Sequence, residues 1–297
     1  EGWDGMWTDM SEIVRPTRDG IHGREFISTV VDIGRKPPFL KFDERGQPID
    51  SNLHVISIPL PILFDIPPTS VASQRLFEII SQAARETETL AIIPLTAINE
   101  FGLQDNHLVP FTTKKERSEL LKLTYEPKMI ELADWDEKVR SDVQSRFPGS
   151  LICLRLPFDS QFQEKLLQYF HSGIRVFHLV ADYHGRNQNG EFILELIRKA
   201  HQTFVNVGIR DEVTLLGSGG IIAAEHVPKA IICGLDAVAL DITISIALQA
   251  KMVEECTDRD TCRLHFPKKV PVEWGVTRIK NLLSSWRDQM LEILGAM

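Results

Sequence analysis

Apolar and polar positions are most regular between residues 213 and 241, VTLLGSGGIIAAEHVPKAIICGLDAVALD. The apolar run at 213–216 predicts a buried strand, and a glycine-rich turn follows it at 217–220. Apolar residues then recur at helical spacing until Gly234, and a second apolar strand is expected at 237–240. Strand, helix and strand in this order form one βαβ unit, in which the strands are parallel and buried on both faces.

The same alternation repeats along the chain. Eight strands are predicted, at residues 54–64, 90–94, 107–111, 128–132, 151–156, 175–181, 213–216 and 237–240. Amphipathic helices follow nearly every strand, at residues 70–86, 113–123, 134–147, 160–171, 191–207 and 275–296. Ser70 is the expected N-cap of the first helix, and residues 96–106 show no full helix. So many units without a break in composition indicate one (β/α)₈ TIM barrel over residues 53–297, whereas a doubly wound open sheet rarely has as many.

Residues 1–52 lack a long periodic segment and are predicted to form an irregular N-terminal extension. We expect it to cover one end of the barrel as a lid or plug. Residues 26–33 are compatible with a strand or a short helix. Residues 39–49, FLKFDERGQPI, indicate a hairpin that turns at Glu44-Arg45-Gly46.

Composition narrows the classes of function. The formal charge of −8 over 297 residues argues against a nucleic-acid binder, which needs a basic face. No apolar run approaches the roughly 20 residues that span a bilayer, so membrane insertion is not expected. The amino terminus is acidic and unlike a signal peptide, and four scattered cysteines indicate a reducing, cytoplasmic setting. The chain begins without Met and stops inside an apparent helix, so we expect it to be part of a longer chain or complex.

The turn formed by Gly217, Ser218, Gly219 and Gly220 is a candidate phosphate site. Glycines let backbone N–H groups approach a ligand, and a following helix start adds partial positive charge. If its strand is the seventh of eight, the turn lies where TIM barrels commonly bind phosphate. A tight connection without a ligand is the alternative for such a short motif.

Residues 217–241, with 274–297, resemble the carboxyl-terminal third of the FMN-binding, glutamate synthase-like barrels, which carry a Ser-Gly-Gly turn and a Gly-x-Asp-Ala-Val strand. The resemblance implies FMN at the carboxyl end of the barrel. The FMN phosphate would lie on Ser218, Gly219 and Gly220, with Asp241 and Thr243 nearby. Asp65, after the first strand, is expected either to meet the ring system or to cap its turn.

Three charged residues are candidates for chemistry. Arg155 lies inside an apolar strand, where family members commonly have lysine, and a guanidinium there can stabilise a reduced, anionic flavin. An internal ion pair, for instance with Asp182, is the alternative. His184 and Arg186 follow the sixth strand, where a histidine can move protons and an arginine can clamp an anionic substrate. A solvated turn is the alternative for this segment.

Cys256 and Cys262 share the Cys-x₅-Cys spacing that begins a three-cysteine iron–sulfur site in glutamate synthases. Pro267 stands where the third cysteine would fall. Clusters need more than two thiolates, so the two cysteines are interpreted as ordinary loop thiols and an iron–sulfur cluster is not expected within this chain.

These observations predict an FMN-dependent oxidoreductase of the glutamate synthase-like group. It would transfer electrons between a redox partner, such as an electron-transfer protein or an iron–sulfur subunit, and a small-molecule substrate. A flavin-free barrel that serves as a structural or regulatory subunit of a larger redox complex is the alternative. A third possibility is a sugar phosphate or nucleotide at the phosphate site.

Overall fold

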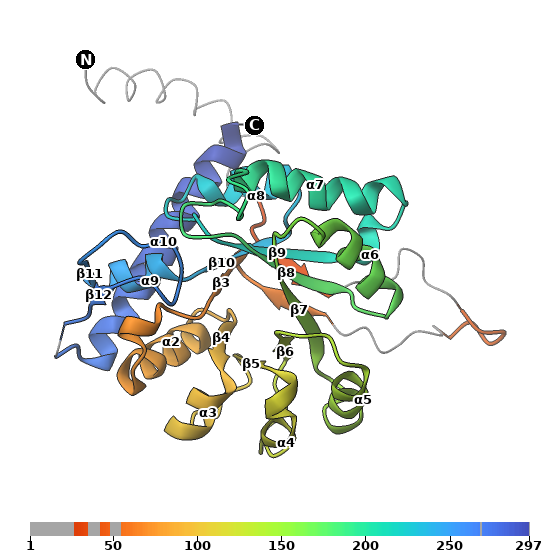
Figure 1. Ribbon diagram of the computed structural model, residues 1–297, viewed down its shortest axis with the longest axis horizontal. Helices are drawn as coiled ribbons and strands as arrows, with labels where there is room; N and C mark the ends of the chain where they lie inside the picture. Colours follow the sequence, from red (N-terminus) through yellow and green to blue (C-terminus); the bar gives the residue numbers. More distant parts are fainter. Residues whose placement is uncertain (1–26, 35–41, 48–54, 268, 297) are drawn as a thin grey trace.

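A computed structural model describes residues 27–34, 42–47, 55–267 and 269–296. Its centre is a closed barrel of eight parallel strands in the order β10-β3-β4-β5-β6-β7-β8-β9, ringed by helices (Figure 1). The strands are β3 (Ile62–Phe64), β4 (Ala91–Pro94), β5 (Leu108–Thr112), β6 (Met129–Leu132), β7 (Leu151–Pro157), β8 (Val176–Val180), β9 (Thr214–Ser218) and β10 (Ala237–Leu240). The predicted TIM barrel is confirmed.

The outer ring follows the predicted alternation closely. Its helices are α2 (Gln74–Glu86), α3 (Leu95–Phe101), α4 (Arg117–Leu120), α5 (Glu137–Arg146), α6 (Phe162–His171), α7 (Ile193–Asn206), α8 (His226–Cys233), α9 (Ile242–Ala247) and α10 (Val272–Ala296). The long helix α10 packs along α2, α8 and α9 and so completes the ring (Figure 1). Among the helices of the described residues, we find none whose length and hydropathy would let it cross a bilayer.

The predicted strand 54–64 is two strands. Within the described residues, β2 (Ile56–Ile58) pairs antiparallel with β1 (Val31–Ile33), and β3 begins only at Ile62. Pro59 and Pro61 separate them because proline has no backbone N–H to donate to a sheet. Ile33 and Ile58 are buried against the barrel interior, and the Gly34 amide donates to Thr214 Oγ1 at the start of β9. The β1–β2 pair therefore closes the amino-terminal end of the barrel.

Other details of the predicted elements change. Helix α3 occupies the stretch where no full helix was expected, directly after β4. Ser73, not Ser70, caps α2 by accepting a hydrogen bond from the Leu76 amide. In residues 42–47 the chain turns as predicted, and the Gly46 amide donates to Asp43 O. The two arms of the predicted hairpin lie largely outside the described residues.

Helix α8 begins at His226 rather than immediately after the glycine turn. Pro228 then falls in its first turn, where a missing N–H costs nothing because it would have no intrahelical partner. A helix that started at Ile221 would place this proline in its interior. The partial charge of the α8 amino terminus is therefore displaced from the glycine turn by several residues.

Two layers fill the interior of the barrel. The apolar layer consists of side chains that pack together inside the strands: Leu63, Ile92, Val109, Met129, Cys153, Val176, Leu216 and Ala239. Two residues further along most of these strands lies a second set, which we call the polar layer: Asp65, Glu131, Arg155, His178, Ser218 and Asp241. Alternate residues of a strand point to the same face, so both layers face inward. The polar layer lies at the carboxyl ends of the strands.

Candidate functional site

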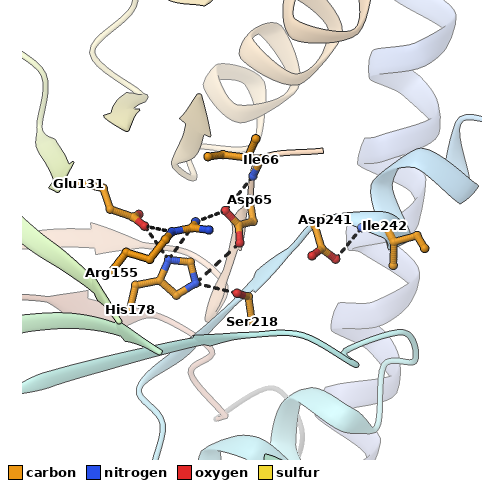
Figure 2. Close-up of polar contacts among 8 residues, drawn as sticks. All are labelled: Asp65, Ile66, Glu131, Arg155, His178, Ser218, Asp241 and Ile242. Atoms are coloured by element: carbon orange, nitrogen blue, oxygen red, sulfur yellow. Dashed lines mark hydrogen bonds and ion pairs between the residues drawn. The ribbon is translucent and has the colours of Figure 1, made fainter. Parts of the chain in front are cut away.

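An ion-pair network centred on Arg155 occupies the carboxyl end of the barrel. Arg155 on β7 forms ion pairs with Glu131 on β6 and with Asp65 after β3 (Figure 2). The side chains of Glu131 and Asp65 are 0% and 4% exposed, while that of Arg155 is 15% exposed. The alternative of an internal ion pair is confirmed, but the suggested partner is wrong. Asp182 Oδ1 instead accepts from the amides of His184 and Arg186 in its own loop.

His178 on β8 extends this network to the glycine turn. Its Nδ1 lies 3.0 Å from Glu131 Oε1 and 3.3 Å from Arg155 Nη2. Its Nε2 lies 3.0 Å from Ser218 Oγ and 3.8 Å from Asp65 Oδ2 (Figure 2). The imidazole is fully buried, and so is the Ser218 hydroxyl. The chain Ser218–His178–Glu131–Arg155–Asp65 is therefore one continuous set of buried polar contacts.

The mutual contacts of Asp65, Glu131 and Arg155 favour the charged form of each group. Burial alone would raise the pKa of Asp65 and of Glu131, but the charge of Arg155 and the hydrogen bonds that each carboxylate accepts hold both below their ordinary values. Burial opposes the charge of Arg155, yet the two carboxylates raise the pKa of its guanidinium above the ordinary value. Arg155 also lies 5.0 Å from the centroid of the Phe111 ring, which extends from β5 on the far side of β6. The guanidinium is a fixed, oriented positive charge.

Asp241, which directly follows β10, behaves differently. Its side chain accepts a hydrogen bond from the Ile242 amide and so caps α9 (Figure 2). Burial, with the nearby charge of Asp65, raises the pKa of Asp241 to about 7. Tyr183 lies close to both carboxyls, and burial followed by the charge of Asp241 raises the pKa of its phenol. The Tyr183 hydroxyl is buried without a hydrogen-bond partner among the described residues.

The glycines of the turn serve two purposes. A side chain at Gly217 would meet Leu235 at 2.4 Å, so this glycine lets Leu235 pack against β9. Gly219 and Gly220 have φ values of 101° and 70°, and a Cβ on either would strike the backbone of the loop that follows β8. Their amides donate no hydrogen bond to any other described residue. Two backbone donors therefore stay available beside the polar layer.

The remaining predicted residues surround this centre. Thr243 is buried and its hydroxyl donates to Ile221 O, which ties α9 to the turn. His184 is exposed and lies 3.5 Å from Glu255 Oε1, whereas Arg186 donates to Gly190 O within its own loop. The structure thus brings Asp65, Arg155, Ser218 and Asp241 together (Figure 2). His184 and Arg186 are exposed residues of the loop that follows β8.

Cys256 and Cys262 form a disulfide, so the interpretation as ordinary thiols is wrong. They lie between β11 (Lys251–Met252) and β12 (Leu264–His265), in a segment we call the strap, residues 251–265. The strap joins two loops at the carboxyl end of the barrel: Thr257 O accepts from the Tyr183 amide, and Arg259 O accepts from the Thr69 amide. Among the described residues, no group of three or more His, Cys, Asp or Glu side chains is arranged to hold a metal ion.

Glu131 and His178 are the residues that the sequence reading missed. Each lies within a strand that is otherwise apolar, MIEL for β6 and VFHLV for β8. A buried charged or titratable group in such a run needs a partner, as was argued for Arg155. Counting two residues on from each inward-facing apolar side chain would have found both.

Comparisons with known proteins find relatives for the carboxyl-terminal part of the chain. Residues 181–297 match the conserved region in glutamate synthase. The archaeal glutamate synthase (NADPH) of Methanocaldococcus jannaschii is 33% identical over 95 residues, which are 30% of this chain and 19% of that protein. The archaeal-type glutamate synthase (NADPH) of Dehalococcoides mccartyi is 32% identical over 96 residues, with the same shares. The match thus spans about a fifth of the length of these curated relatives.

Solved structures extend the likeness of fold to most of the chain. A FabK variant from Thermotoga maritima has a TM-score of 0.53 at 11% identity, covering 81% of this chain and 96% of that chain. A mandelate oxidase variant with a monooxide FMN adduct has a TM-score of 0.52 at 14% identity, covering 96% and 94%. At such low identities these structures speak for the fold alone. The likeness to the glutamate synthase-like family therefore rests on residues 181–297, and the two curated relatives match 30% of the chain.

Proposed function

We propose that the protein is an FMN-dependent oxidoreductase that transfers electrons between a redox partner and a small-molecule substrate. The proposal rests on the amides of Gly219 and Gly220, which donate no hydrogen bond to any other described residue. They lie beside a buried polar layer that contains a fixed positive charge. Backbone donors in a glycine turn suit a phosphate, and a guanidinium suits an electron-rich ring or a carboxylate.

The residues of the site divide the work. The amides of Gly219 and Gly220 would hold the phosphate, with Ser218 and Thr243 fixing the turn and Gly217 allowing it to pack. FMN, when bound, supplies the electron-accepting ring. Arg155 would stabilise negative charge there, and Asp65 orients the guanidinium through their ion pair. His184 and Arg186, on the loop that follows β8, would meet the substrate.

Asp241 is compatible with a phosphate only in its neutral form. A carboxylate at this position would repel a dianion, whereas a protonated carboxyl can donate a hydrogen bond to it. Because burial raises the pKa of Asp241 to about 7, much of the carboxyl is protonated near neutral pH. The electron partner would be an electron-transfer protein or an iron–sulfur subunit within a larger complex.

Flavin titration tests the proposal. Freshly purified protein, or apoprotein mixed with FMN, is expected to show flavin absorbance and quenched flavin fluorescence. Gly219→Ala should abolish binding, because its Cβ would lie 2.5 Å from Ala181 O and displace the turn. Gly190→Ala is the matched control, since Gly190 also has a positive φ but no atom within 4 Å of the added Cβ. A wild-type protein that binds no FMN would refute the proposal.

A flavin-free barrel that serves as a structural or regulatory subunit is the second candidate. One observation favours it: Asp241 already places a carboxyl at the amino terminus of α9, where a bound anion would otherwise sit. Thermal-shift measurements with FMN, inorganic phosphate and simple sugar phosphates separate the cases. Stabilisation by FMN alone supports the enzyme, stabilisation by the sugar esters supports another phosphate ligand, and no stabilisation supports the subunit.

A further inference from the structure

Among the described residues, His178 joins the glycine turn to the Arg155 network. It contacts Ser218 of the turn on one side, and Glu131 and Arg155 on the other. We infer that His178 is a positioning residue whose tautomer couples an anion on the Gly219–Gly220 turn to the placement of the Arg155 guanidinium. The inference rests on the proposed phosphate site. The coupling follows from the contacts of the ring, because Nδ1 has two competing partners, Glu131 and Arg155, while Nε2 contacts the Ser218 hydroxyl.

Two neutral tautomers are compatible with the contacts. With the proton on Nδ1, His178 donates to Glu131 Oε1, and Nε2 accepts from the Ser218 hydroxyl. With the proton on Nε2, His178 donates to Ser218 Oγ, and Nδ1 accepts from Arg155 Nη2 at 3.3 Å. The direction of the Ser218 hydroxyl therefore decides which partner His178 takes inside the barrel.

An anion on the turn favours the second tautomer. Ser218 directly precedes Gly219, so its hydroxyl hydrogen is attracted toward an anion held by the Gly219 and Gly220 amides. Once Ser218 donates outward, its oxygen can only accept from His178, and the imidazole proton moves to Nε2. Nδ1 then accepts from Arg155, and Glu131 keeps only its ion pair with Arg155. No proton is gained or lost overall.

The consequence is a reciprocal coupling between two anion sites. A phosphate on the turn would fix Arg155 through His178, and a second anionic group that needs Arg155 in that position would bind more tightly. Thermodynamic linkage requires the converse, that the second group strengthens phosphate binding. The ligand class is therefore a phosphate monoester together with an electron-rich ring or a carboxylate at Arg155.

Nuclear magnetic resonance of the ¹⁵N-labelled apoprotein, titrated with inorganic phosphate, tests this without flavin or activity. We expect the Gly219 and Gly220 amides to shift on binding. In the same titration the His178 imidazole nitrogens should change from the Nδ1–H to the Nε2–H pattern, and the Arg155 Nε–H signal should move. His201 is the internal control, because it lies on α7 of the outer ring, where its Nδ1 accepts from Arg210 Nε.

Ser218→Ala removes the link but keeps every backbone amide. In this variant the glycine amides should still respond to phosphate, while His178 and Arg155 do not. FMN affinity should fall roughly 5- to 10-fold, at the lower end of typical coupling strengths, and the reduction potential of bound flavin should change. Ser218→Thr, which keeps the hydroxyl, should restore the wild-type FMN affinity and reduction potential.

The outcomes distinguish the two proposals. If the glycine amides respond but the His178 tautomer does not change, the coupling is refuted and the phosphate site stands. If Ser218→Ala retains the wild-type response of Arg155, the coupling does not run through this hydroxyl and is equally refuted. If the glycine amides do not respond to phosphate or to FMN, the proposed function fails and the coupling fails with it.

Discussion

The two layers inside the barrel are built by the same strands and have opposite chemistry. In the apolar layer, Cys153 and Val176 are fully buried among aliphatic side chains, and the β1–β2 pair seals the end below them. Two residues further along, Arg155 and His178 belong to a buried set of charges and hydrogen bonds. One step of the strand repeat separates the two environments.

This difference shows which end of the barrel is free to do chemistry. Burying aliphatic surface stabilises a fold without further conditions, whereas buried charges lose hydration and repay it only when they are paired. Glu131 retains one carboxylate oxygen, Oε2, that is buried without a hydrogen-bond partner among the described residues. A layer kept at this cost is expected to serve a ligand.

Arg155→Met should destabilise the protein most. The substitution leaves the carboxylates of Asp65 and Glu131 buried without their cation, for which we expect a loss of about 3–5 kcal/mol in the free energy of unfolding. Arg117→Met is the control, because Arg117 and Asp142 form an ion pair near the surface, with a worth of about 0–1 kcal/mol. Urea unfolding compares the two. Equal losses would mean that the polar layer is no more demanding than the surface.

Asp241→Asn should change how stability depends on pH. The pKa of Asp241 is about 7 in the fold and near 4 in the unfolded chain, so between these values the folded protein holds a proton that the unfolded chain has released. Stability therefore falls as the pH rises through this window, by about 2–4 kcal/mol in total. The variant should lack this fall and be the more stable protein above pH 7.

Unfolding by urea at a series of pH values measures this slope. Asp136→Asn controls for the loss of an N-cap carboxylate, because Asp136 caps α5 on the outer ring. Asp65 and Glu131 contribute in the opposite sense and at lower pH. Their pKa values lie below the ordinary range, so their stabilisation is lost as the pH falls through those folded values. A wild-type slope as flat as that of Asp241→Asn would contradict the buried, neutral carboxyl.

The contrast between the layers also shows how far the sequence can be read. Short apolar runs bounded by turn residues were enough to predict the eight strands of the barrel, since a buried parallel strand needs only such a run. Pro59 and Pro61 separate β2 from β3, but the long apolar run over residues 54–64 predicted a single strand. Helix α3 was missed because it has only seven residues and no polar N-cap, starting directly from Pro94.

The site was harder to predict because partners far apart in the chain meet in it. Arg155 lies 24 residues from Glu131 and 90 residues from Asp65 in sequence. Which carboxylate faces the guanidinium depends on strand order and register. Neither can be predicted from the sequence of a single strand. Asp182 was a reasonable partner by proximity in sequence, but its carboxylate is used by its own loop.

Breaking the Cys256–Cys262 disulfide should have a smaller and more local effect. The bond closes a short loop, for which we expect roughly 2 kcal/mol of stabilisation. Replacing both cysteines by serine should raise amide hydrogen exchange in the strap and at Tyr183 and Thr69, which donate to it. Cys233→Ser is the control, because Cys233 is a free cysteine at the end of α8. Unchanged exchange at Tyr183 and Thr69 would show that the strap holds its place without the bond.

His184→Ala should change stability least, by less than about 0.5 kcal/mol, because the contact with Glu255 joins two exposed side chains. Turnover is the measurement that matters for this residue. If His184 serves the substrate, the variant should lose turnover while its FMN affinity and unfolding free energy stay at the wild-type values. Glu255→Gln, which alters the same contact from the strap, controls for the ion pair itself. Full turnover in His184→Ala would confine the chemistry to the polar layer, to which Arg155 and Asp241 belong.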